Sequence, residues 1–248
     1  MIRTIQRQLA LIFIATTYGY YLAGGFFCPQ VLSFEFVILA ENQSDKGQGA
    51  PIFSEFIRTL KSYTSIEPGQ KTKVVAASLR DLYDYPLLFA RVDQVQSQDD
   101  PKILGHKIVK WLLAGGTLIM EGTASRRELD TLVDHSYFKS QKEKTWKVIS
   151  PDHELTRSFF LLKNLPICPS HTWREYRSDG RMMILHTPTG FLHSASDEHR
   201  SAPVGCFANQ ANYQENLKRT LINLIMVILT TDYKKDQIHL PEILKRIR

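Results

Sequence analysis

The chain has 248 residues, a formal net charge of +6 and a pI of about 9.2. Hydrophobic residues make up 43% and aromatic residues 10%, with no low-complexity tract, which excludes a disordered or fibrous chain. The basic residues are scattered and their densest clusters lie at the two ends, which argues against nucleic-acid binding. This length accommodates one full domain behind a leader.

The first thirty residues have the pattern of an export leader. Arg3 and Arg7 precede an uncharged run, Leu9 to Phe27, and the first acidic residue is Glu35. We expect residues 1–30 to be a cleaved signal peptide or, as the second choice, an N-terminal membrane anchor, because the run is weak for a membrane span. The protein is then periplasmic, or anchored and facing the periplasm; a cytoplasmic protein with a buried first helix is the alternative.

The cysteine count depends on that leader. Removal of a leader that includes Cys28 leaves Cys168 and Cys206, an even pair in an oxidising compartment. A disulfide and two buried thiols both fit this pair, and we favour the thiols slightly because both cysteines have apolar neighbours. The bulky residues before Cys28 argue against lipidation there. No cysteine or histidine group has zinc spacing, and we expect no metal or other cofactor.

Residues 31–248 are predicted to form one domain in which strands and helices alternate. Apolar runs of strand length cover 34–40, 73–77, 85–92 and 117–120. A first helix is expected where Phe53, Phe56, Ile57 and Leu60 recur at helical spacing.

A second helix is expected to open at Asp99, Asp100 and Pro101, and Gly115-Gly116 ends it. Its apolar face consists of Ile103, Leu104, Ile108, Trp111 and Leu112. A strand follows at once, and this order predicts an α/β fold with a mainly parallel central sheet flanked by helices.

The last third of the chain offers three more strands and a long apolar helix. The strands are 146–149, 181–186 and 204–207, and the helix is Leu217 to Leu229. Asn223 interrupts the apolar run, so burial against the sheet is favoured over a membrane span.

Polar residues that follow two of these strands are the candidate site. In a parallel sheet, ligands bind beyond the carboxyl ends of the strands, so Asp93, Glu121, Thr123 and Ser125 are expected to line one cleft. Glu121 is the candidate general base or cation ligand, with His186 as acid, base or ligand. The structural interpretation is preferred for both: Glu121 caps the next helix, and His186 is a satisfied strand-end histidine.

Other polar groups carry weaker signals. Asp152, His153 and Arg157 are candidates for anion binding, but we prefer that Asp152 caps a turn on which His153 packs, with Phe159 and Phe160 in the core. His193, Asp197 and His199 lie in a polar segment that is typical of a surface loop. The basic C-terminus, which includes Lys234 and Lys235, fits either an anionic lipid surface or simple solubility.

Several runs of this chain resemble the successive landmarks of one bacterial family of unknown function, DUF4159. These runs are Tyr85 to Phe89, Trp111 to Ile119, Ser150 to Leu155, Ser158 to Phe160 and Asp232 to Pro241. The resemblance covers about Phe34 to the C-terminus and implies a flavodoxin-like or class I glutamine-amidotransferase-like fold in an exported or membrane-linked protein. It implies no activity. The family often has paired acidic residues after the Gly-Gly strand, whereas this chain keeps only Glu121.

The patterns of amidotransferases and serine hydrolases are absent. Cys168 lies between Pro166 and Pro169, Cys206 has no small-residue elbow on both sides, and no serine lies in Gly-x-Ser-x-Gly. Two hypotheses remain. The first is a non-catalytic envelope module that binds a protein partner and associates with the membrane through its N-terminus. The second is a small-ligand-binding protein or hydrolase that uses Glu121 and His186.

Overall fold

The computed structural model describes residues 35–40, 53–69, 72–76, 80–96, 104–134, 138, 145–168, 171–178, 180–192 and 210–247. All of them lie in one compact unit, Phe34–Arg248. The leader, the segment with His193, Asp197 and His199, and the expected strand at 204–207 lie outside the described residues.

A mixed sheet of seven strands forms the centre of this unit, in the order β2-β1-β3-β4-β7-β6-β5. The first five strands of this order are parallel, and β6 and β5 add two antiparallel pairings at one edge. The strands are β1 Val37–Ala40, β2 Lys73–Ala76, β3 Leu87–Arg91, β4 Thr117–Glu121, β5 Thr145–Val148, β6 Arg174–Ser178 and β7 Arg181–Thr187. The prediction of an α/β fold with a mainly parallel sheet is confirmed.

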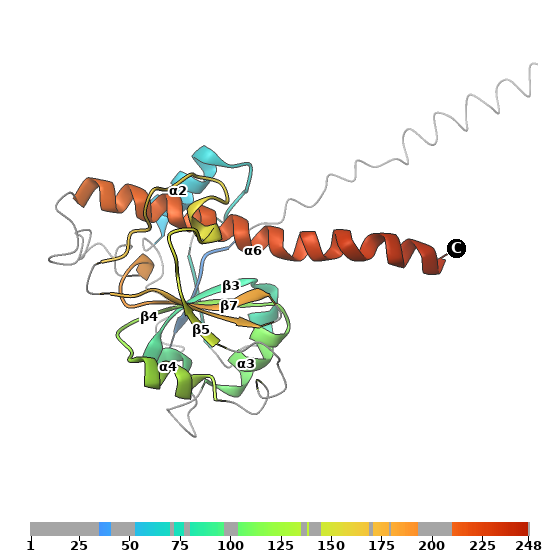
Figure 1. The fold of residues 1–248 in the computed structure, drawn as a ribbon, viewed down its shortest axis with the longest axis horizontal. Helices are drawn as coiled ribbons and strands as arrows, with labels where there is room; N and C mark the ends of the chain where they lie inside the picture. Colours follow the sequence, from blue (N-terminus) through green and yellow to red (C-terminus); the bar gives the residue numbers. More distant parts are fainter. Residues whose placement is uncertain are drawn as a thin grey trace, which may run out of the picture. The chain divides into compact units, whose positions relative to one another are not determined.

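Helices cover both faces of this sheet (Figure 1). The α-helices are α2 Ser54–Tyr63, α3 His106–Leu113, α4 Arg126–Leu132 and α6 Gln210–Ile247, and short 3-10 helices are η2 Arg80–Asp84, η3 Val92–Val95 and η5 Glu154–Thr156. The residues of α2 and α6 belong to one buried core, and those of α3 and α4 to the other. The central parallel strands β3 and β4 therefore bury both of their faces, whereas the edge strand β5 is mostly exposed.

Aromatic rings fill the core on the α2 and α6 side. The ring of Phe53 lies 5.0 Å from that of Phe36 and 4.7 Å from that of Phe89, so α2 is attached to β1 and β3 through its first residues. Leu224 and Ile225 of α6 are fully buried in the same core. The apolar run Leu217 to Leu229 predicted a buried helix, and this part of α6 does pack into the core.

The turn between α3 and β4 is tightly packed. Gly115 has a φ of 118°, which glycine adopts without strain. A Cβ on Gly116 would lie 2.2 Å from the indole of Trp111, whose Nε1 donates to the carbonyl of Tyr85 at 2.9 Å. Arg181 donates to the carbonyls of Gly115, Gly116 and Leu112 and so satisfies the end of α3.

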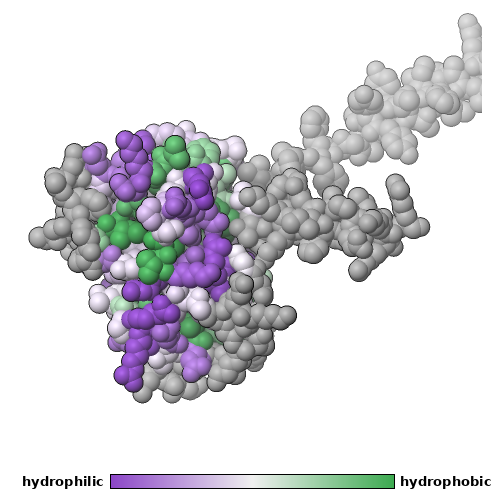
Figure 2. All heavy atoms as spheres, in the orientation of Figure 1, coloured by the Kyte–Doolittle hydropathy of each residue, from purple (hydrophilic) through white to green (hydrophobic). Residues whose placement is uncertain are grey.

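Two helix boundaries and one strand differ from the sequence prediction. The second helix begins at His106, not near Pro101, and Leu104 precedes it in an isolated bridge with Gln96. Strand β6 was not predicted, and α6 continues to Ile247 rather than ending at Leu229. On the face drawn in Figure 2, exposed apolar residues lie between strongly hydrophilic ones.

Candidate functional site

A cavity of about 760 Å³ lies at the carboxyl ends of β3 and β4. Its wall includes Asp93, Glu121 and Thr123, together with Arg91 and Arg127. Ligands of parallel α/β sheets bind at this end. The structure therefore brings three of the four residues of the expected cleft around one cavity.

Ser125, the fourth residue of the expected cleft, is the N-cap of α4. Its Oγ accepts a hydrogen bond from the N–H of Glu128 at 3.2 Å, and its own N–H donates to Glu128 Oε2 at 2.6 Å. The backbone N–H of Ser125 holds the pKa of the Glu128 carboxyl below its usual value. The prediction that Glu121 caps this helix is wrong. Ser125 occupies the N-cap position, and its side chain accepts a hydrogen bond from an N–H in the first turn of α4.

Asp93 is already engaged at the cavity mouth. Its Oδ1 lies 3.3 Å from Nε of Arg91, and the side chains are 61% and 69% exposed. An ion pair that is this exposed is strongly screened by water and contributes little to stability.

Glu121 and His186 point to opposite faces of the sheet. Glu121 is in register with Thr187, whereas His186 is in register with Met120. Residues in register on parallel strands face the same way, and successive residues alternate. Glu121 therefore faces the α2 and α6 side, His186 faces the α3 and α4 side, and the two side chains do not share a site.

Glu121 is held by the segment that follows β7. Its side chain is only 7% exposed, and its Oε2 accepts a hydrogen bond from the N–H of Leu192 at 2.9 Å. Gly190 lies close by, since a Cβ on it would be 3.8 Å from the same oxygen. The carboxylate thus fastens the chain after β7 to the end of β4.

His186 is fully buried, and its Nε2 lies 2.8 Å from the carbonyl oxygen of Gly122, to which it donates. Within the described part of the chain, its Nδ1 has no hydrogen-bond partner. Burial lowers the pKa of His186, the Gly122 carbonyl opposes this, and the charge of Arg174 lowers it further, so the net pKa is below the usual value. The ring is therefore neutral near pH 7.

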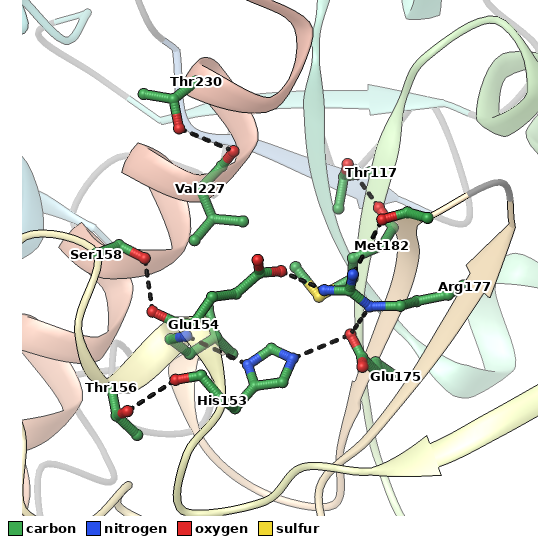
Figure 3. A network of polar contacts seen from close by, with 12 residues as sticks. Thr117, His153, Glu154, Thr156, Ser158, Glu175, Arg177, Met182, Val227 and Thr230 are labelled. Carbon is green, nitrogen blue, oxygen red and sulfur yellow. Dashed lines mark hydrogen bonds and ion pairs between the residues drawn. The ribbon is translucent and has the colours of Figure 1, made fainter. Parts of the chain in front are cut away.

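A second polar network joins η5 to β6 (Figure 3). Nε2 of His153 lies 3.1 Å from Oε2 of Glu175, and Nε of Arg177 donates to the same oxygen at 2.8 Å. Arg177 also pairs with Glu154. Nδ1 of His153 accepts the N–H of Leu155 at 3.2 Å, so both ring nitrogens have structural contacts.

The charge in this network stabilises a buried carboxylate. Glu175 is 4% exposed, and burial raises the pKa of its carboxyl. His153 and Arg177 together lower this pKa by more than burial raises it, so the net pKa is below the usual value. A lowered pKa means that this network stabilises the fold at neutral pH and that its contribution is lost as the pH falls through the folded-state pKa.

The anion-binding set Asp152, His153 and Arg157 is not assembled into a pocket. His153, not Asp152, is the N-cap of η5, because its imidazole nitrogen reaches the N–H of Leu155. Asp152 and Arg157 are both exposed. Phe159 is 43% exposed rather than in the core, and only Phe160 packs against the core.

Asn223 of α6 is a structural residue that the sequence reading took only as an interruption of the helix. Its Oδ1 accepts the N–H groups of Phe159 at 3.0 Å and Phe160 at 2.6 Å. Its Nδ2 donates to the carbonyls of Leu155 at 2.7 Å and Phe160 at 2.9 Å. A polar residue within a buried apolar run is the signal that indicates such a role.

Three further observations concern cysteine, metals and membranes. Cys168 is disulfide-bonded, so the preference for free thiols is wrong for this residue; the other two cysteines, Cys28 and Cys206, lie outside the described residues. In the described ranges, no group of three or more His, Cys, Asp or Glu side chains has the arrangement of a metal site. Among the same residues, no helix combines the length and the apolar character that crossing a membrane requires.

Comparison with protein families gives one match. The model of DUF4159, a domain of unknown function, matches residues 36–229, and comparison with curated proteins gives no match. The matched region includes the whole sheet and α2, α3 and α4, while the run Asp232 to Pro241 lies beyond it. Because the match covers most of the chain, the protein belongs to the DUF4159 family.

Proposed function

We propose that this protein is an exported, non-catalytic module of the bacterial cell envelope that binds a protein partner. The observation that carries the proposal is that Glu121 and His186, the ionisable candidates near the strand ends, are already held by hydrogen bonds within the fold. Glu121 accepts the N–H of Leu192, His186 is buried and bonded to Gly122, and the two face opposite sides of the sheet. A catalytic acid and base must both reach the reacting atoms.

Two features support export. Arg3 and Arg7 followed by an apolar run are typical of a leader. The disulfide at Cys168 fits the same location, because disulfides persist in the periplasm and are rare in the cytosol.

Export is tested by alkylation of intact cells that produce the full chain. Cys168 should resist a thiol reagent until a reductant is added, and a C-terminal alkaline phosphatase fusion should be active only with the leader present. Arg3→Glu combined with Arg7→Glu is the leader control, and it should abolish phosphatase activity. A Cys168 thiol that reacts fully without reductant, or an inactive wild-type fusion, would contradict export.

The binding role is tested by site-specific cross-linking in the producing cells. Glu121→Gln and His186→Gln should leave a discrete cross-linked partner band unchanged, because both side chains are buried and bonded within the fold. Loss of the band in both variants, with folding retained, would contradict the purely structural role given to these two residues.

The cavity at the ends of β3 and β4 favours a second candidate, a small-ligand-binding protein or hydrolase. Its volume of about 760 Å³ is that of pockets that hold small molecules. A thermal-shift screen with metabolites, sugars, nucleotides and divalent cations tests it. A stabilising ligand whose effect is lost in Glu121→Gln or Asp93→Asn, but kept in the exposed control Asp152→Asn, would establish this second candidate.

A further inference from the structure

Four neighbouring side chains form an exposed apolar surface beside the end of α2. The ring of Phe160 lies 5.0 Å from that of Phe159 and 5.3 Å from that of Tyr63. Phe159 is 43%, Tyr63 50% and Leu161 87% exposed. We call Tyr63, Phe159, Phe160 and Leu161 the apolar tip.

The apolar tip is held in place from inside the protein. Asn223 is fully buried and fixes the backbone of Phe159 and Phe160 through three hydrogen bonds, and a fourth attaches it to Leu155. The N–H of Leu162 donates to the carbonyl of Thr156 at 2.7 Å and closes the loop. Because this backbone is already ordered, contact through the tip requires little further loss of conformational entropy.

The surroundings of the tip are positively charged. Arg157 and Lys163 are exposed and flank the tip in sequence, and the guanidinium of Arg219 lies 5.4 Å from the ring centre of Phe160. Glu215 pairs with this same Arg219, and Arg177 is shared by Glu154 and Glu175, so the positive charge that the tip offers to a partner is that of Arg157 and Lys163. The local balance around the tip therefore favours an anionic surface.

A bilayer interface matches this combination better than a protein does. Aromatic and aliphatic side chains bury themselves at the boundary of headgroups and acyl chains, while neighbouring Lys and Arg stay with the anionic headgroups. A stable protein interface needs a far larger area than four side chains provide. We propose that the apolar tip docks on a bilayer that contains anionic phospholipid, inserting Phe159 and Leu161.

This role goes beyond the proposed protein-binding function, with which it shares only a location beside a membrane. It is also separate from the leader, because Phe159 and Leu161, the residues proposed to insert, lie more than 120 residues after residue 30 in sequence. A measurement at the tip itself distinguishes docking through the tip from anchoring through the leader.

The test is the fluorescence of Leu161→Trp in the full chain, mixed with vesicles of brominated phosphatidylcholine and phosphatidylglycerol. The native Trp111, Trp146 and Trp173 are 1%, 3% and 1% exposed and are out of reach of lipid. Fluorescence from position 161 should fall by roughly half relative to vesicles without bromine, as expected for a ring at the headgroup and acyl-chain boundary. High salt, vesicles without phosphatidylglycerol, or Arg157→Gln with Lys163→Gln should each reduce that loss.

The matched control is Val148→Trp, at a position on β5 that is 58% exposed and apolar in the wild type. Its fluorescence should be unaffected by bromine. Equal quenching at both positions would mean that the leader alone holds the protein on the vesicle, and would overturn the proposal. The absence of quenching in both Leu161→Trp and Phe159→Trp would also overturn the proposal, and a protein would then be the partner that binds the tip.

Discussion

Asn223 connects α6 to the loop that carries Phe159 and Phe160. Replacement by leucine keeps the size but leaves four backbone groups near η5 without their partner. Each buried polar group left unpaired costs about 1–3 kcal/mol, so we expect Asn223→Leu to lower the free energy of unfolding by roughly 3 kcal/mol or more.

The measurement is urea unfolding. Asn216→Leu, on the same helix and partly exposed, is the matched control and should change the free energy of unfolding by less than about 1 kcal/mol. Equal effects of the two substitutions would show that the hydrogen bonds of Asn223 do not hold the loop.

His186 should make the fold sensitive to mild acid. Burial lowers its pKa in the folded state, so below the ordinary histidine pKa the unfolded chain binds a proton that the folded chain rejects. Stability must then fall as the pH drops from neutral, at most by about 1.4 kcal/mol per pH unit for one proton.

His186→Gln should flatten this dependence between neutral and mildly acidic pH in urea unfolding midpoints. The exposed His106, replaced in the same way, serves as the control for the loss of an imidazole ring. A slope that persists in His186→Gln would assign the acid sensitivity to other groups.

The sequence predicted which side chains lie at the carboxyl ends of the strands, because that depends only on position along each strand. Asp93, Glu121 and Thr123 were placed at one end of the sheet, and they do surround one cavity. The pairing of Glu121 with His186 failed, because facing direction depends on the register between β4 and β7, which no local pattern reveals.

At the scale of elements, the turn from α3 into β4 depends on a glycine for space. A methyl group on Gly116 would overlap the indole of Trp111, which is itself fixed by its bond to Tyr85. Gly116→Ala should therefore cost about 3 kcal/mol, the upper range for overpacking.

Gly105→Ala is the matched control, because a Cβ there meets nothing nearer than 3.7 Å, and it should cost less than about 1 kcal/mol. Thermal unfolding of both variants is the measurement. A Gly116→Ala protein as stable as the control would mean that Trp111 moves aside freely.

Elements with a clear apolar pattern were predictable, and those without one were not. Lys73 to Ala77 and Arg181 to His186 became β2 and β7 with nearly the expected bounds. Strand β6 was missed because it contains Arg174, Glu175 and Arg177, and a charged run does not predict a buried strand. It is buried nonetheless, because Arg177 pairs with the Glu175 carboxylate and His153 contacts the same oxygen.

At the scale of the whole molecule, two cores lie on either side of one sheet and should unfold together. Trp173 reports on the α2 and α6 core, and Trp111 and Trp146 report on the other. Leu224→Ala and Ile108→Ala empty one core each, and each should cost about 2–5 kcal/mol.

In both variants the transitions followed by fluorescence and by circular dichroism should coincide, with the same dependence on urea as the wild type. Two separate transitions, with only one shifted by each substitution, would show that the faces unfold independently.

The position of β7 in the sheet determines when this chain can fold. It lies between β4 and β6, although about sixty residues separate it from β4 in sequence, and the helix that completes one core comes later still. Until residues 181–187 emerge from the ribosome, β4 lacks one of its two neighbouring strands and the sheet is incomplete. Contacts between such distant segments slow folding. We therefore expect the chain to stay unfolded until most of it has been synthesised, a state that suits the export proposed above.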